Sequence, residues 1–304
     1  MGTRTPLMSR PHVGGNFAYA DIAGHTGCIW FVGSTVTGAT DAVGYGRDPD
    51  KPFATLDYVN SQATAHAGDV VYLLPGHVEV VAGAAGLVMD CAGLHVIGCG
   101  NGTYQPIIRL TLAAADIDID AANVTFENVN FQAGAADVIA AIDVNATDFT
   151  IRKCRFTEQT AALNALIWIQ DAGGAGSDRI TVEDCLVYAP DTANTHFINF
   201  AGTGTGHVIR RNCLLGDWGT MAIGGAGIVT ECNVSDNYIY NLAVTVNGCI
   251  NFAATATGVM SGNMVGNSAA ANNQIIATGM SKNFNYGVDI AGGDVQGIPE
   301  PAMA

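Results

Sequence analysis

Short runs with β-type alternation of apolar and polar residues recur along most of this chain. The run Phe126–Phe131 is apolar at its first and last positions, polar at the second and third, and variable at the fifth. The first position of each copy, called the anchor, recurs every 24 to 31 residues, at Leu73, Ile97, Phe126, Ile151, Val182, Ile209, Val234, Met260 and Ile290. A period in this range predicts a repeat architecture.

The fourth position of the repeat indicates how the chain turns. It is Gly or Asn in most copies, and Cys at Cys154 and Cys185. Because Gly and Asn enter the left-handed backbone region at little cost, we expect this position to ease a corner between two short strands.

Each period also carries a pair of apolar residues separated by one residue. Period-2 alternation places the middle residue outside, which predicts an exposed Trp168. Three short strands fit in about 25 residues, so each period is expected to form one coil, and about nine coils stack at ~4.8 Å. The pairs are Ile142/Val144, Ile167/Ile169, Ile198/Phe200, Ile250/Phe252 and Ile275/Ala277.

The repeat also defines the organisation of the chain. Residues 1–27 lack the period and predict an extended arm. Residues 28–68 are expected to hold a first strand, a loop and a capping helix, residues 69–296 the coils, and residues 297–304 a tail. We interpret the whole as one domain with end structures, because a solenoid grows by adding coils.

The capping helix is predicted to begin at Asp50, whose carboxylate is placed to cap it, with Pro52 in the first turn. An apolar face formed by Phe53, Leu56, Val59 and Ala63 is expected to cover the open end of the coils, and Gly68 to end the helix.

The stretches from Gly44 to Leu56 and from Gly68 to His77 resemble the beginning of right-handed parallel β-helix proteins of the pectate-lyase-like class. In particular, they are similar to phage-encoded β-helix repeat proteins found among virion structural genes. The resemblance spans residues 28 to about 290 and implies an all-β, single-stranded right-handed parallel β-helix. It implies no particular activity, since many unrelated activities occur on this fold.

The amino-acid composition limits the kinds of partner that this chain is expected to bind. Twelve basic residues against 27 acidic ones give a net charge of −15, which disfavours nucleic-acid binding. The basic residues of the middle coils, such as Arg152 and Arg210, are expected to pair with Glu127, Glu158, Glu183 and Asp184. No apolar run is long enough for a membrane span, and the first residues do not lead into a signal-peptide core.

Eight cysteines are spread through the chain without a CxxC pair, so buried free thiols are expected rather than a disulfide framework or a metal site. Cys154 and Cys185 occupy the same position in consecutive coils and are expected to stack, although parallel side chains do not automatically reach the torsion of a disulfide.

Three carboxylates, Asp116, Asp118 and Asp120, lie on one face of a predicted strand. A strand spaces them about 6.6 Å apart, too far for one calcium ion, so outward, solvated carboxylates are expected instead of a cation site.

Catalytic patterns of this fold class are incomplete. A lyase of the pectate type needs clustered aspartates and a basic proton acceptor, and a hydrolase needs two carboxylates roughly 5 to 10 Å apart. The lyase candidates occupy different positions of their coils, and acidic pairs arise by chance in so acidic a chain. The lyase candidates are Asp143, Asp171, Asp184, Arg152 and Arg179, and the hydrolase pairs are Glu183 with Glu127 and Asp217 with Asp236.

Aromatic and histidine residues give weaker indications. Trp168 and Trp218, with Tyr238 and Tyr240, are candidates for a carbohydrate cleft, but a subunit interface is the preferred interpretation. Single histidines without a paired carboxylate are interpreted as coil or corner residues, and the glycine-rich run 202–206 lacks the Lys of a phosphate loop. These histidines are His77, His196 and His207.

We therefore assign no catalytic, cofactor or metal residue and expect a non-enzymatic virion protein, made in the host cytoplasm and placed on the outer surface of a phage capsid. Its expected partners are further copies of itself, in a homotrimer, and the major capsid protein, contacted by the arm; no nucleic acid or membrane is expected. The alternatives are a tail-associated enzyme that binds or cleaves polysaccharide and, less favoured, a surface adhesin.

Overall fold

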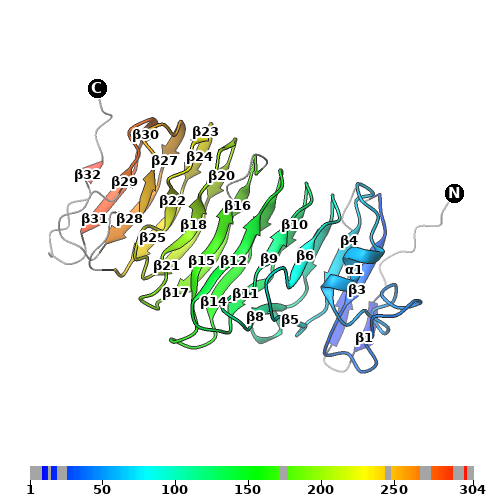
Figure 1. Cartoon of the computed structure of the whole chain (residues 1–304). Coiled ribbons are helices and arrows are strands. Elements are labelled where there is room, and N and C mark those ends of the chain that lie inside the picture. Colours follow the sequence, from blue (N-terminus) through cyan, green and yellow to red (C-terminus); the bar gives the residue numbers. More distant parts are fainter. Residues whose placement is uncertain are drawn as a thin grey trace.

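The computed structural model describes residues 9–12, 15–18, 26–171, 177–243, 248–267, 275–289 and 298–299. Within these ranges the chain winds into a right-handed parallel β-helix whose coils follow one another along one axis (Figure 1). The predicted fold class is therefore confirmed. No helix in the described part of the chain is long and apolar enough to cross a membrane.

Three parallel sheets run along the helix axis, and each complete coil adds one strand to every sheet. The first sheet has ten strands: β3 (Ile29–Val32), β4 (Val70–Leu73), β7 (His95–Gly98), β10 (Thr125–Glu127), β13 (Thr150–Arg152), β16 (Thr181–Glu183), β20 (Val208–Arg210), β24 (Cys232–Ser235), β27 (Gly258–Ser261) and β30 (Met280–Asn283).

The second sheet also has ten strands, the last of which is antiparallel to its neighbour. They are β5 (Val78–Val81), β8 (Ile107–Leu110), β11 (Asn130–Ala133), β14 (Arg155–Glu158), β17 (Leu186–Ala189), β21 (Cys213–Gly216), β25 (Tyr238–Asn241), β28 (Met264–Asn267), β31 (Tyr286–Asp289) and β32 (Ile298–Pro299).

The third sheet has eight strands, so the described residues form eight complete coils and part of a ninth. These strands are β6 (Leu87–Met89), β9 (Ile117–Ile119), β12 (Val138–Val144), β15 (Ala165–Asp171), β18 (His196–Phe200), β22 (Ile223–Gly225), β26 (Ile250–Phe252) and β29 (Ile275–Ile276). Besides the helix α1 (Leu56–Gln62), the remaining elements are β19 (Gly204–Thr205) with β23 (Val229–Thr230), the 3-10 turn η1 (Gly102–Tyr104), and the antiparallel pair β1 (Ser9–His12) and β2 (Gly15–Ala18), which lies within the predicted arm.

The predicted anchors of the middle coils lie directly above one another in the first sheet. Phe126 pairs in register with Ile151, Ile151 with Val182, Val182 with Ile209, and Ile209 with Val234. All five side chains are fully buried. The central geometric prediction of the sequence analysis is confirmed.

The two anchors predicted at the N-terminal end were wrong, whereas Met260 pairs in register with Val234 as predicted. Phe126 pairs with Val96 rather than Ile97, and Val96 pairs with Val71 rather than Leu73. The outward residues of these first strands are apolar too, because they form a second small core that includes Phe31 and Tyr72, so alternation does not distinguish the faces there. At the other end Met260 pairs with Lys282, and the predicted anchor Ile290 lies outside the described residues.

The left-handed corner residue is the third position of the repeat, not the fourth as predicted. Asn128 (φ 57°), Lys153 (φ 53°) and Asp184 (φ 55°) hold this conformation, as do Arg211 and Asp236 (both φ 55°). The fourth position points inward instead. There the side chains satisfy backbone groups that a corner leaves without a strand partner, which explains the preference for Asn.

These fourth-position side chains form a buried ladder, here called the corner ladder: Cys154, Cys185, Asn212, Asn237, Asn263 and Asn285. In its Asn part, each side-chain oxygen accepts the backbone N–H of the preceding rung, as Asn237 Oδ1 does from Asn212 at 3.1 Å. Each side-chain nitrogen donates to the anchor carbonyl of the coil before, as Asn237 Nδ2 does to Ile209 at 3.0 Å. The two cysteines continue the ladder as free thiols, so their predicted stacking is confirmed.

Trp168 is fully buried, which contradicts its predicted exposure. It lies one residue before Ile169, which pairs in register with Ile142 and Ile198, and both Trp168 and Ile169 point inward. Two successive inward residues break the alternation, and Ile167 is the partly exposed one. Trp168 packs edge-on against Phe156 at 5.6 Å, and Trp218 is equally buried.

The capping helix exists, but it begins later than predicted. α1 (Leu56–Gln62) has Thr55 as its N-cap, whose side chain accepts the N–H of Tyr58, whereas Asp50 lies in the preceding turn. Leu56 and Val59 are fully buried in the main core at the N-terminal end of the coils (Figure 1). Glu79 fastens the helix, because its carboxylate accepts the N–H of Leu56 at 2.9 Å.

Candidate functional site

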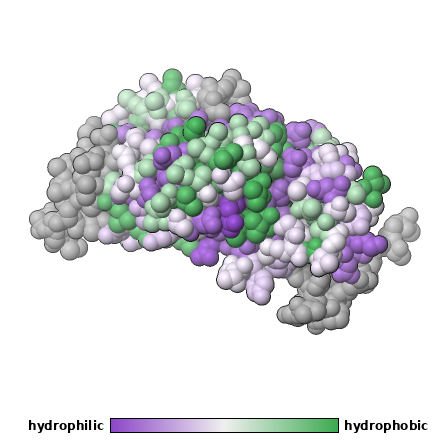
Figure 2. Space-filling view, turned by 60° about the horizontal axis from the view of Figure 1, so that its bottom comes forward, coloured by the Kyte–Doolittle hydropathy of each residue, from purple (hydrophilic) through white to green (hydrophobic). Residues whose placement is uncertain are grey.

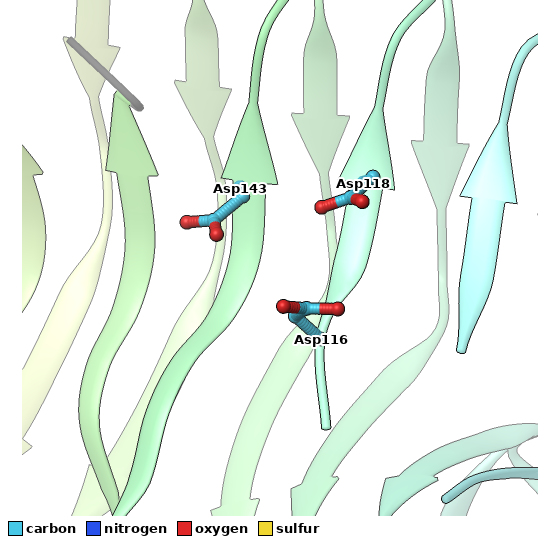
Figure 3. Close-up of side chains that lie close together, drawn as sticks. All are labelled: Asp116, Asp118 and Asp143. Atoms are coloured by element: carbon cyan, nitrogen blue, oxygen red, sulfur yellow. The ribbon is translucent and has the colours of Figure 1, made fainter. Parts of the chain in front are cut away.

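Three carboxylates meet on the outer face of the third sheet. Asp118 of β9 and Asp143 of β12 are register partners in adjacent coils, and Asp116 directly precedes β9. Figure 3 shows Asp118 and Asp143 on neighbouring strands, with Asp116 below them just before β9 begins. One carboxylate oxygen from each lies within 4.8 Å of the others. Asp120, the third member of the predicted set, is exposed and is replaced in the cluster by Asp143 from the next coil.

The electrostatics of this acidic cluster are unfavourable in the charged state. Burial, and then the negative charges of Asp116 and Asp118, raise the pKa of Asp143 to about 6. Burial and the charges of Asp116 and Asp120 also raise the pKa of Asp118. Asp143 Oδ1 is buried and accepts no hydrogen bond from the described residues. A divalent cation of the oxygen-preferring kind could bind three such oxygens, with water completing its shell of ligands.

We expect Asp143→Asn to raise the free energy of unfolding at pH 7 by about 1 kcal/mol, a discounted value because the group is partly exposed. With the folded pKa at about 6 and the unfolded pKa near 3.8, the folded state binds more protons between them, so stability falls as the pH rises through this window. Denaturant melts from pH 3 to 8 should show a shallower slope in Asp143→Asn than in the wild type, because other carboxyl groups with raised pKa values, such as that of Glu158, keep part of it. Asp120→Asn is the control, and an unchanged slope in Asp143→Asn would contradict the prediction.

The other lyase candidates do not join the cluster. Asp171 is buried and accepts hydrogen bonds from the Ser177 hydroxyl and the Gly202 N–H. Arg152 and Arg179 are paired with Glu127 and Asp148, at 2.8 and 2.6 Å. Both candidate arginines are thus bound to carboxylates outside the cluster.

On the first sheet, acidic and basic residues alternate from coil to coil and form ion pairs. Arg152 lies between Glu127 and Glu183 in the register of β10, β13 and β16, and Arg210 follows Glu183. Burial acts to raise the pKa of Glu127, but the hydrogen bond from Lys153 and the charge of Arg152 outweigh it and hold the pKa below its ordinary value.

The predicted pairing of the basic residues is therefore confirmed for Glu127, Glu183 and Asp184, whereas Glu158 binds Asn194 instead. Both carboxylates of the predicted hydrolase pair, Glu127 and Glu183, are bound to these basic side chains. Asp217 follows the last residue of β21, whereas Asp236 precedes the first residue of β25, so the two acids lie at opposite ends of strands that pair in register and the predicted pair is not formed.

The histidines are structural, with one correction. His77 does have a carboxylate partner, because its Nε2 lies 3.0 Å from Glu79 Oε2, and both side chains are buried beneath α1. His207 accepts the Ile180 N–H, and burial lowers the pKa of His196 to about 4. The glycine-rich run contributes strand β19.

Sequence reasoning missed a surface on the second sheet. The variable fifth position of the repeat becomes apolar from β17 onwards, and this was the available signal. The exposed side chains include Leu186, Tyr188, Tyr238, Met264 and Tyr286, each 40 to 52% exposed. Figure 2 brings forward the side on which Figure 1 labels β5, β8, β14 and β17, and green and pale atoms cover much of it.

No protein-family model matches this chain, and no curated protein matches its sequence. Among solved structures, a rhamnogalacturonan lyase is similar over 81% of this chain and 75% of its own, with 15% identity and a TM-score of 0.46.

Proposed function

We propose that this chain is a non-enzymatic structural protein of a phage particle, located on the outer surface of the capsid. The observation that carries the proposal is an exposed apolar surface on the second sheet, formed by residues such as Tyr188 and Tyr238, beside a first sheet whose charged residues form ion pairs with one another. Apolar and aromatic surfaces of this kind are typical of protein contacts.

The deciding experiment is the stoichiometry of the chain in purified particles, measured by quantitative mass spectrometry against the major capsid protein. A capsid decoration protein is present in hundreds of copies, whereas a tail spike is present in a handful. A chain missing from the particles, or present only in a few copies at the tail, would contradict the proposal.

The arm gives a second prediction. We propose that residues 1–27 contact the major capsid protein and that the β-helix assembles as a homotrimer. Removing residues 1–27 should release the protein from particles while leaving the β-helix folded, as circular dichroism can check, because its first strand, β3, begins at Ile29. A truncated protein that still decorates capsids would show that the arm is not the anchor.

A second candidate function is a tail-associated enzyme or lectin for polysaccharide, and the acidic cluster of Asp116, Asp118 and Asp143 favours it. This function predicts halos on host lawns that Asp143→Asn abolishes, and a melting temperature that millimolar Ca²⁺ raises in the wild type alone. The structural function predicts no halo with either protein.

A further inference from the structure

The outward positions of the second sheet are continuous from coil to coil. In register, Leu186 lies beside Cys213, Cys213 beside Tyr238, Tyr238 beside Met264, and Met264 beside Tyr286. A parallel row places Tyr188 beside Leu215 and Leu215 beside Tyr240. We call these eight residues the second-sheet face: Leu186, Tyr188, Cys213, Leu215, Tyr238, Tyr240, Met264 and Tyr286.

Carboxylates are missing from the described outward positions of this sheet. Arg109 and Arg155, nearer the N-terminal end, are the two charged residues there. The first sheet, in contrast, carries Glu127 and Glu183 outside, and the third carries Asp118 and Asp143. In a chain with 27 acidic residues against 12 basic ones, such a face is unusual.

The charge distribution favours a second copy of this chain as the binding partner of the second-sheet face. Two copies of a chain with a net charge of −15 repel each other over most of their surfaces, but the second-sheet face brings no carboxylates together. Tyr and Met side chains are enriched in the centres of protein interfaces, and in a closed homo-oligomer the same face of every copy can turn towards the symmetry axis.

Charged residues of both signs that form no ion pair with a described residue lie around the face. Asp191 and Asp217 follow β17 and β21 at the edge of the face, and neither forms an ion pair with a described basic residue. Arg155 is exposed and has no acidic partner among the described residues. A second copy can place its Arg155 near Asp191 and Asp217 of the first copy, and its own Asp191 and Asp217 near the Arg155 of the first.

We propose that the second-sheet face binds a second copy of this chain, an inference that rests on the proposed self-assembly of a structural protein. Five coils of face measure only about 24 by 13 Å, and a stable contact buries about 800 Å² per partner. The contact is therefore expected to continue towards Val80, which is 58% exposed.

Met264→Lys and Val259→Lys form a matched test, since the two residues lie in the same coil and are 49% and 44% exposed, on the second and first sheets. The full chain, 31.3 kDa, is run in sedimentation velocity. We expect an oligomer for the wild type and Val259→Lys, and at least tenfold weaker association for Met264→Lys. Circular dichroism checks folding, and Tyr238→Lys repeats the test in another coil.

Maleimide labelling of Cys213, which is partly exposed within the face, is a second readout. Labelling should slow with association in the wild type and stay fast in Met264→Lys. A monomeric wild type, or an oligomer that both Met264→Lys and Tyr238→Lys leave intact, overturns the proposal. If the chain is absent from particles, only the proposed virion function is overturned. If both variants still form the oligomer and the particles hold hundreds of copies, only the proposed role of the second-sheet face is overturned.

Discussion

Asn237→Ala is expected to lower the free energy of unfolding by about 4 kcal/mol, because each buried polar group left without a partner costs about 1 to 3 kcal/mol. Asn237 Oδ1 accepts both the backbone and the side-chain N–H of Asn212, and Nδ2 donates to Ile209 O and Asn263 Oδ1. Alanine deletes these bonds and leaves a space in a buried corner.

Two variants serve as controls for this experiment. Asn233→Ala changes an exposed Asn of β24 and should stay within about 0.5 kcal/mol of the wild type. Asn237→Cys introduces the residue that the corner ladder carries at Cys154 and Cys185, and should cost less than Asn237→Ala. Chemical denaturation with hydrogen exchange of the neighbouring coils measures all three, and equal stability of Asn237→Ala and Asn233→Ala would contradict the prediction.

Glu79→Ala is expected to destabilise the N-terminal end by about 3 kcal/mol, the scale of breaking a buried polar pair from one side. The change leaves the Leu56 N–H and His77 Nε2 without their acceptor beneath α1. His77 Nδ1 accepts the Ser34 N–H, which identifies Nε2 as the donor to Glu79. Hydrogen exchange should accelerate in α1 and the first coil.

Glu79→Gln keeps an acceptor oxygen and is the matched variant, with a smaller expected loss than Glu79→Ala. If exchange in α1 is the same in the wild type and in Glu79→Ala, the helix is held by its apolar face alone. Leu56 and Val59 would then account for its attachment.

The coil architecture could be predicted because the buried positions repeat with one period. Ile151, Val182 and Ile209 are apolar anchors between polar neighbours, so alternation and period agree there. The register of the first coils could not be predicted, because their strands are apolar on both faces. Tyr72 and Ile97 face a second small core, so alternation does not show which residues point into the main core. The prediction for Trp168 was wrong because it assumed regular alternation. The alternation breaks within β15, and nothing in the local sequence marks the break.

The candidate sites depended on relations between coils that spacing along one strand does not contain. Asp143 joins Asp116 and Asp118 through the register of β9 with β12, which a reading of one strand misses. The partner of His77 was likewise missed, although Glu79 is only two residues away, because both residues turn inward at the start of β5.

The corner ladder also bears on how the length of this protein can change. Every rung from Asn212 to Asn263 presents the same donor and acceptor to the coil on either side. Duplicating or removing one whole period in this part therefore restores every bond of the corner ladder without a new side chain. Related chains can thus gain or lose height in steps of about 4.8 Å while the two ends stay the same.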